Sequence, residues 1–433
     1  MTEGRGSFVM HKYTINLLDV MRKKIKQHSL RTIPLLLIIT GFFVMINVFF
    51  LFLIIQSQPT KETNNQFPEL MALGQKQFDF NELTVFFRKV AEQKGSAYAF
   101  GLMNAASIPP GTDMHLLAHE IGDVLYKKEG ATGMRLCNED FRNACSHSIV
   151  VGLFRDKGEE ALPIIADACR LAPGGTGAYT MCFHGLGHGI LAYAGYDLTR
   201  STAICKKTGT PAYRNREYVE CVGGSIMEIT GGVHDARLRE KQAKKYLSSK
   251  DPLSPCSADF MDDSTRPLCY LYLTPHLLTL AGADLGDPNP QYFKKAFGFC
   301  DLIKSSSVDR DACYAGFGKE YIGIVRSRDA RLSTLISIDD DKLTLIYEWC
   351  MGIVDRSGAR ACLLSAENSL YWGGEHGENL PLSFCAVFDD QSHRDECFSN
   401  LIGALHFYKP DPRMREVACK KFPVSYQKQC VTG

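Results

Sequence analysis

The sequence predicts an all-α protein: a disulfide-stapled array of helical-hairpin repeats, α-solenoid-like, that follows a single N-terminal transmembrane helix. Three observations predict this fold class. An uncharged apolar segment lies near the N-terminus, sixteen cysteines beyond it fall into eight regularly spaced pairs, and no sustained alternation of apolar and polar residues indicates strands. Repeat periods of a few tens of residues, as between these pairs, are typical of solenoid arrays.

The apolar segment is long enough to cross a bilayer. Residues 32–60 carry no charged side chain, and the 24 residues from Ile33 to Gln56 are nearly all Leu, Ile, Phe and Val. At about 1.5 Å per residue such a helix spans roughly 36 Å, which exceeds the hydrocarbon core. The alternative is a cleaved signal peptide, but its apolar region would measure about 7–15 residues and end at small residues. We therefore expect an uncleaved signal-anchor helix at residues 32–56, in contact with membrane lipid.

The charges that flank this segment predict its orientation. Five basic residues precede it closely, whereas only Lys61 follows it closely. Because an excess of Lys and Arg stays on the cytoplasmic side, we expect a single-pass protein of the cell membrane with residues 1–31 as a cytoplasmic tail. Residues 57–75 then form a polar linker, and residues 76–433 form an extracytoplasmic repeat domain. All sixteen cysteines lie in that domain, which fits an oxidising compartment.

The cysteines pair naturally when they are taken in order. The separation within a pair is 8 to 16 residues, and second cysteines recur every 33 to 49 residues. A disulfide that closes a loop of about a dozen residues contributes about 3 kcal/mol. A zinc-ribbon use of the cysteines is disfavoured because no C-x2-C pair occurs. The expected disulfides are Cys137–Cys145, Cys169–Cys182, Cys205–Cys221, Cys256–Cys269, Cys300–Cys313, Cys350–Cys362, Cys385–Cys397 and Cys419–Cys430.

The context of the cysteines predicts the repeat. The first cysteine of a pair ends an amphipathic stretch, helix B, and a polar linker follows. The second cysteine opens the next stretch, helix A, which is rich in small residues that let a neighbouring helix approach closely. An N-terminal repeat without cysteines is predicted as well, in which Asp113 stands where later repeats have Cys and is suited to cap a helix.

Histidines recur at one position of the first three repeats. When Asp113, Cys145 and Cys182 are aligned, each is followed two residues later by histidine, and the first and third repeats have a second histidine four residues further on. The next five repeats have Gly, Leu, Ala, Leu and Ser at the first of these positions, so the repeat itself does not require histidine. The five histidines are His115, His119, His147, His184 and His188.

This spacing favours a ligand site. Residues i and i+4 share one helix face, so both imidazoles of a pair can reach one metal ion. We expect the five histidines to hold a divalent transition metal, with zinc preferred, or haem. A polar groove without metal and a purely structural role are the alternatives. The run from Cys182 to Gly189 also places three glycines in one helical turn, which predicts a close approach by a helix or a ligand.

Three functions follow from these features. The preferred one is a membrane-anchored, extracytoplasmic helical-repeat protein with a metal or haem site lined by histidines. The alternatives are a scaffold that binds a protein or an envelope polymer on the solenoid face, and a metal-dependent hydrolase in which Glu120 serves as acid or base. The formal net charge of +1 gives no polyelectrolyte character, so no nucleic-acid partner is expected.

The orientation is testable by protease protection. When protease is added outside intact cells, residues beyond 57 should be digested and residues 1–31 spared, because the basic flank holds the N-terminus inside. Mass spectrometry of the protected peptides checks this. Protection of the C-terminal part with loss of the tail would reverse the topology.

Overall fold

A computed structural model describes residues 67–75, 78–173, 175–232, 236–283, 289–331, 338–373, 377–409 and 411–433. Throughout these ranges the chain forms α-helices and short 3-10 helices joined by turns, without a strand. None of the helices described has the length and apolar character needed to span a bilayer. The predicted cytoplasmic tail and the signal-anchor helix at 32–56 lie outside the described residues, so both stay predictions.

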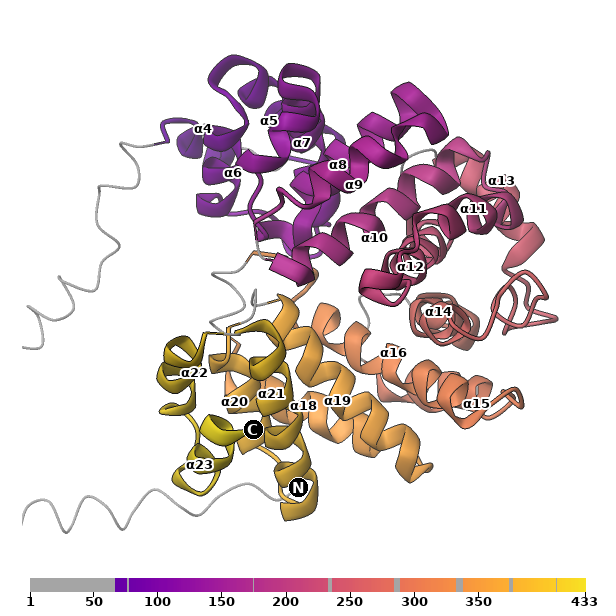
Figure 1. Cartoon of the computed structure of the whole chain (residues 1–433), viewed down its shortest axis with the longest axis vertical. Helices are drawn as coiled ribbons and strands as arrows, with labels where there is room; N and C mark the ends of the chain where they lie inside the picture. The colour runs from indigo at the N-terminus through magenta and orange to yellow at the C-terminus, as the bar shows by residue number, and fades with distance from the viewer. Residues whose placement is uncertain are drawn as a thin grey trace, which may run out of the picture. The chain divides into compact units, whose positions relative to one another are not determined.

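Helices from Glu69 to the C-terminus form one compact unit (Figure 1). The helices that correspond to helix A are α7 (Met114–Glu129), α8 (Asp140–Lys157), α10 (Gly175–Tyr193), α12 (Arg216–Gly231), α14 (Arg266–Ala281), α16 (Ser307–Val325), α19 (Arg356–Gly373), α21 (Gln391–Tyr408) and α23 (Val424–Thr432). The helices that correspond to helix B are α9 (Leu162–Cys169), α11 (Leu198–Cys205), α15 (Pro290–Cys300), α18 (Asp340–Met351), α20 (Asn379–Ala386) and α22 (Pro412–Cys419).

The remaining elements precede or interrupt this alternation. They are α4 (Glu69–Gln75), α5 (Phe80–Lys94), α6 (Ser96–Ala105), α13 (Ala236–Tyr246) and the 3-10 helices η1 (Gly130–Leu136), η2 (Gly158–Ala161), η3 (Lys206–Thr208) and η4 (Pro211–Tyr213). Helix α4 lies within the segment predicted as linker. The expected N-cap of α7 is present, because the Asp113 carboxylate accepts a hydrogen bond of 3.1 Å from the Leu116 backbone N–H.

All eight predicted disulfides are present, and no described cysteine is free. Every half-cystine is at most 5% exposed, so the bridges are part of the core. The helices that carry the second cysteine start earlier than predicted, three to seven residues before it. The reason is that linker residues such as Ser306 and Asp390 act as N-caps and convert the end of the linker into a first helical turn.

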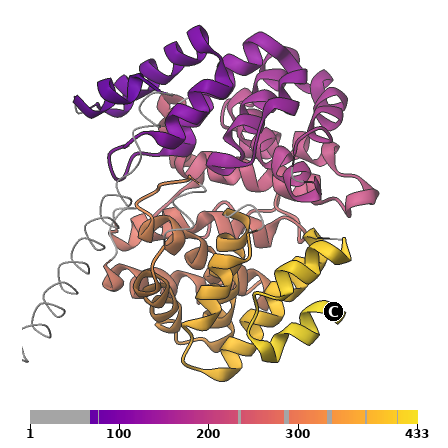
Figure 2. The same ribbon diagram turned by 90° about the vertical axis from the view of Figure 1, so that its left-hand side faces the viewer.

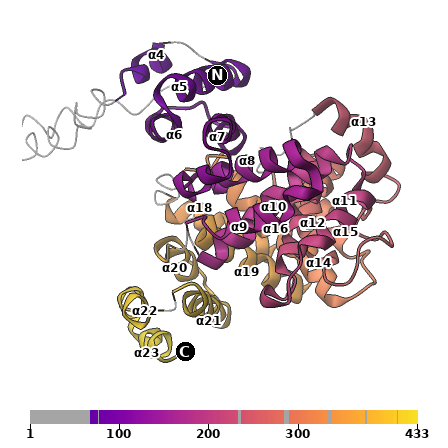
Figure 3. The ribbon, with the colours of Figure 1, turned by 45° about the horizontal axis from the view of Figure 1, so that its top comes forward.

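Consecutive A helices pack side by side in the order α7, α8, α10, α12, α14, α16, α19 and α21. Figure 2 shows the indigo-to-magenta helices of the first repeats above the orange-to-yellow helices of the last ones, and Figure 3 shows the row from a further direction. The row curves back on itself, because the segment after α16 reaches the segment before α7. There the Gly111 N–H donates to the Ser327 carbonyl oxygen (3.0 Å), and the Arg331 guanidinium donates to the Ala106 carbonyl oxygen (2.6 Å).

The glycine-rich turn of α10 is explained by two close neighbours. A Cβ atom at Gly187 would lie 2.9 Å from the Ser225 backbone nitrogen and closer still to the Cys221 carbonyl oxygen, so this glycine admits the backbone of α12. A Cβ atom at Gly185 would overlap the imidazole of His147, so that glycine admits a side chain from α8. The predicted close approach is therefore confirmed, and the neighbours are protein.

Replacement of Gly187 by Ala should destabilise the protein by about 1–3 kcal/mol, because the rigid α12 backbone would have to move away. The matched control is Gly403→Ala in α21, where nothing lies within 4 Å of the added Cβ. That change should be neutral or stabilise by up to about 1 kcal/mol, since Ala favours helix over Gly. Denaturant unfolding of the two variants measures the difference, and equal effects would contradict the close packing of α10 on α12.

Candidate metal centre

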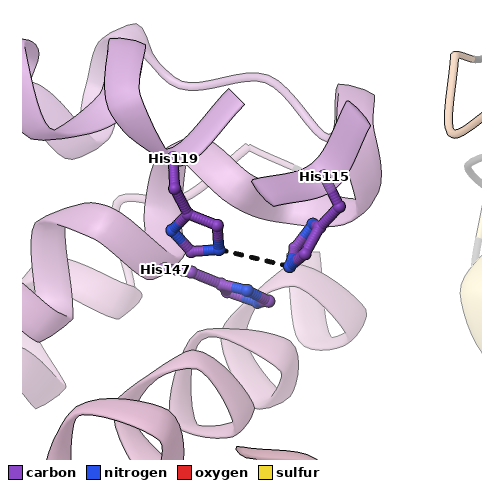
Figure 4. A group of neighbouring side chains, drawn as sticks. All are labelled: His115, His119 and His147. Atoms are coloured by element: carbon purple, nitrogen blue, oxygen red, sulfur yellow. Dashed lines mark hydrogen bonds between the residues drawn. The ribbon is translucent and has the colours of Figure 1, made fainter. Parts of the chain in front are cut away.

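Three of the predicted histidines converge from two adjacent helices. His115 and His119 lie one turn apart on α7, and His147 projects toward them from α8 (Figure 4). One ligand nitrogen from each ring lies within 4.8 Å of the other two. Helices α7 and α8 pack against each other. Because His115 and His147 occupy equivalent positions of two adjacent repeats, this packing brings the three rings together.

The nitrogens of the α7 pair point their lone pairs at each other. His115 Nδ1 lies 2.7 Å from the Phe141 carbonyl oxygen, which only accepts, so this nitrogen carries the proton of the neutral ring. The Ser148 hydroxyl donates to the His119 carbonyl oxygen (3.0 Å), so it accepts from His119 Nδ1–H (3.0 Å). With Nδ1 protonated in both rings, the two Nε2 atoms, 3.2 Å apart, present their lone pairs to each other, so that a shared proton or a metal ion can lie between them.

The acceptor of His115 depends on an unusual backbone. Phe141, Arg142 and Asn143 all have left-handed conformations, with φ of 53°, 55° and 62°. Such angles are rare for non-glycine residues and costly for Phe and Arg, and they persist only where surrounding contacts impose them. They place the Phe141 carbonyl oxygen where it accepts a hydrogen bond from His115 Nδ1. A metal-binding histidine is typically oriented by such a hydrogen bond from its other ring nitrogen.

His147 lies at the centre of the cluster. It is 2% exposed, and within the described part of the chain neither of its ring nitrogens has a hydrogen-bond partner. A buried polar group without a partner is costly, and a metal ion bound to a ring nitrogen would offset this cost. Burial lowers the pKa of His147 well below its usual range, and the neighbouring histidines lower it further. The ring is therefore neutral at pH 7 and able to donate a lone pair.

The second histidine pair lies on the other side of His147. The ring centroid of His184 is 6.0 Å from that of His147, and the centroid of His188 is 6.1 Å away. Each of the two lies beside a buried carboxylate of α12. His188 Nδ1 is hydrogen-bonded to Glu228 (3.0 Å), and His184 Nδ1 lies 3.6 Å from Glu220. All five predicted histidines thus form one layer, in which His184 and His188 lie beside carboxylates and the other three converge.

The carboxylates were not anticipated from the sequence. Glu220 is also paired with Arg216 (2.7 Å), and Glu228 accepts from the Tyr196 hydroxyl (2.8 Å). Burial raises the pKa of Glu220, but His184 and Arg216 outweigh it and the pKa is lowered overall. Three glutamates on the glycine-rich helix α12, namely Glu217, Glu220 and Glu228, were the available signal, since a buried carboxylate needs a partner.

Glu120, the candidate acid or base, lies next to His119 in the sequence but on another side of α7. Its carboxylate pairs with Arg88 of α5, whose Nε donates to it over 2.9 Å. Glu120 does not belong to the cluster of His115, His119 and His147, whose ligand nitrogens lie within 4.8 Å of one another. Its catalytic role stays a prediction, and its contact with Arg88 joins α7 to α5.

The chain matches no protein family, no curated protein and no solved structure. The function is therefore inferred from the geometry of the histidine cluster.

The burial of His147 predicts an acid-sensitive fold in the metal-free protein. Its folded-state pKa is lowered, so the unfolded chain takes up a proton below pH 6.5 that the folded chain does not. Stability is therefore full above pH 6.5 and falls with pH toward the folded pKa, by up to about 1.4 kcal/mol per pH unit for each such histidine. His147→Gln should flatten the pH dependence of denaturant unfolding between pH 7 and 5. An unchanged slope would show that His147 is protonated in the folded state.

Proposed function

We propose that the helical domain is a metal-binding module that holds one divalent transition metal, zinc in preference, through Nε2 of His115, Nε2 of His119 and one ring nitrogen of His147. The observation that carries the proposal is the 3.2 Å separation between the two Nε2 atoms. Two nitrogens bound to one zinc ion at about 2.0–2.1 Å with a tetrahedral angle are about 3.3–3.4 Å apart. The pair is therefore arranged as two ligands of one ion.

The same geometry favours a metal ion over haem. Two histidines that bind one haem iron do so from opposite faces of the porphyrin, whereas His115 and His119 are successive turns of one helix and approach one point from the same side. Their ring centroids are 4.7 Å apart, and that of His147 is 5.4 Å from His115. A compact ion with tetrahedral geometry fits this convergence, and three histidines leave one coordination position for water or a ligand.

His184 and His188 complete the layer in a different role. We assign them to a supporting pair that separates the metal ligands from Glu220 and Glu228, which lie 3.6 and 3.0 Å from the Nδ1 atoms of His184 and His188. The metal then has three protein ligands, and the five-histidine set predicted from the sequence divides into three ligands and two supports.

The location proposed for the module is outside the cytoplasm, anchored by residues 32–56. Eight disulfides in one domain support an oxidising compartment, because cytosolic thiols are kept reduced. The charge asymmetry around the apolar segment supports the orientation.

Zinc titration into the metal-free full-length protein, purified in detergent micelles, tests the site. Calorimetry and elemental analysis should find one zinc ion per chain. His119→Gln and His147→Gln should each weaken binding by more than about 100-fold, because the loss of a ligand exceeds the 10- to 100-fold effect of losing an outer hydrogen bond.

Two controls separate the ligands from other histidines. His393→Gln on α21 lies outside the cluster and should leave the affinity unchanged. The double variant His184→Gln with His188→Gln should keep a stoichiometry of one. Failure of the unsubstituted protein to bind zinc, copper, nickel or cobalt would refute the module, and loss of the ion in the double variant would refute the division of roles.

A further inference from the structure

A second group of unsatisfied polar atoms lies where the row of helices closes. The segment after α16 contacts the segment before α7 through the bonds from Gly111 to Ser327 and from Arg331 to Ala106. This contact brings Arg326, at the end of α16, near Arg142 in the left-handed first turn of α8. Asn104 links the two segments, because its carbonyl oxygen accepts from Arg331 (3.2 Å) and its amide donates to Asp140, two residues before Arg142. In agreement with this, burial and then the charge of Arg142 lower the pKa of Arg326 to about 9.

Arg326 is buried with most of its donors unused. It is 5% exposed, and its Nη2 donates a hydrogen bond to the Arg331 carbonyl oxygen (3.0 Å). Among the residues that the structure describes, the buried Nε and Nη1 atoms have no hydrogen-bond partner. A guanidinium presents five N–H donors in a rigid fork that matches two oxygens of an anion. The N–H groups on Nε and Nη1 of Arg326 are therefore available to an anion.

Arg142 differs from arginines at the same position of other repeats. The position lies three residues before the second cysteine, and three other repeats have arginine there. In those repeats the guanidinium has a protein partner: Arg266 with the Met261 carbonyl, Arg310 with Asp355 and Arg394 with the Phe388 carbonyl. No hydrogen bond or ion pair joins Arg142 to any residue that the structure describes. Its charge nevertheless acts on His115, so it lies near the metal ligands.

The nearest carboxylates are already engaged. Asp140 accepts from the Asn104 amide and from the Phe141 N–H (2.8 Å), and Asp329 is held by Arg331 through two or more bonds. Both acids act on Arg326 as well, but among the described residues neither is hydrogen-bonded to its Nε or Nη1. Such buried donors are unfavourable unless an anion accepts from them.

We propose that Arg142 and Arg326 together bind a phosphate group, free or as a monoester, next to the histidine cluster. A phosphate group offers at least three acceptor oxygens, enough for both guanidinium forks, whereas a carboxylate offers only two. The ligand of this domain is accordingly a small phosphorylated molecule or inorganic phosphate. The proposal does not rest on the metal, since both arginines are placed by the protein alone.

Calorimetric titration of the metal-free full-length protein in detergent tests the site with three probes: inorganic phosphate, phenyl phosphate and acetate. At least one of the two phosphate probes should bind at one site, and acetate should bind at least 10-fold more weakly. Arg142→Gln and Arg326→Met should each weaken phosphate binding at least 10-fold. Arg310→Gln, at the matched position with an ion-pair partner, should bind as the unsubstituted protein does.

Thermal unfolding provides a second readout in case Arg326→Met alters the fold. Phosphate should raise the melting temperature of the unsubstituted protein and of Arg310→Gln, but not that of Arg142→Gln, whose side chain is only half-buried. Binding of acetate as tightly as phosphate would overturn the phosphate assignment. An absence of phosphate binding, or equal weakening by Arg310→Gln, would overturn the site, whatever the outcome of the zinc titration.

Discussion

Close approach of consecutive helices is the constraint on which the site depends. The histidines come from three different helices, and their rings meet only because α8 and α10 lie nearer to each other than ordinary side chains would allow. Gly185 supplies that space, since any side chain there would occupy the position of the His147 ring. On the side of α10 that faces α12, Gly187 leaves room for the α12 backbone. This close approach lets Glu228 lie 3.0 Å from His188. One turn of glycines thus sets the spacing of the whole polar layer.

The disulfides fix the same spacing at the ends of the helices. Each bridge joins a short outer helix, or the turn that replaces it, to the long helix that follows. Loops of this length lose little entropy when they fold because the crosslink already restricts them in the unfolded chain. The bridges therefore hold the repeats in order, whereas the glycines determine how near the helices come.

The sequence predicted those parts of the structure that are set by local spacing. The cysteine pairs were predictable because each joins residues close in the chain, and His115, His119 and His147 were predictable because a repeat places equivalent residues on one face. The left-handed run at Phe141 to Asn143 was not, because only Asn commonly adopts that conformation. Glu228 was missed since its contact depends on the separation of α10 and α12. Arg326 was missed since its neighbour Arg142 is remote in sequence and is reached only through the curvature of the whole row.

The bond from Arg331 to the Ala106 carbonyl joins residues 225 positions apart, in a fold whose other main contacts run between successive repeats. Local contacts form early because they need little loop closure, and distant ones form late. During synthesis of the chain, the first repeats can assemble before Arg331 has been added. The histidine layer needs only the residues up to Glu228, so it can be complete before the contact between Arg331 and Ala106 exists. Folding is thereby divided in time, because the ends of the row join only after some 330 residues have been made.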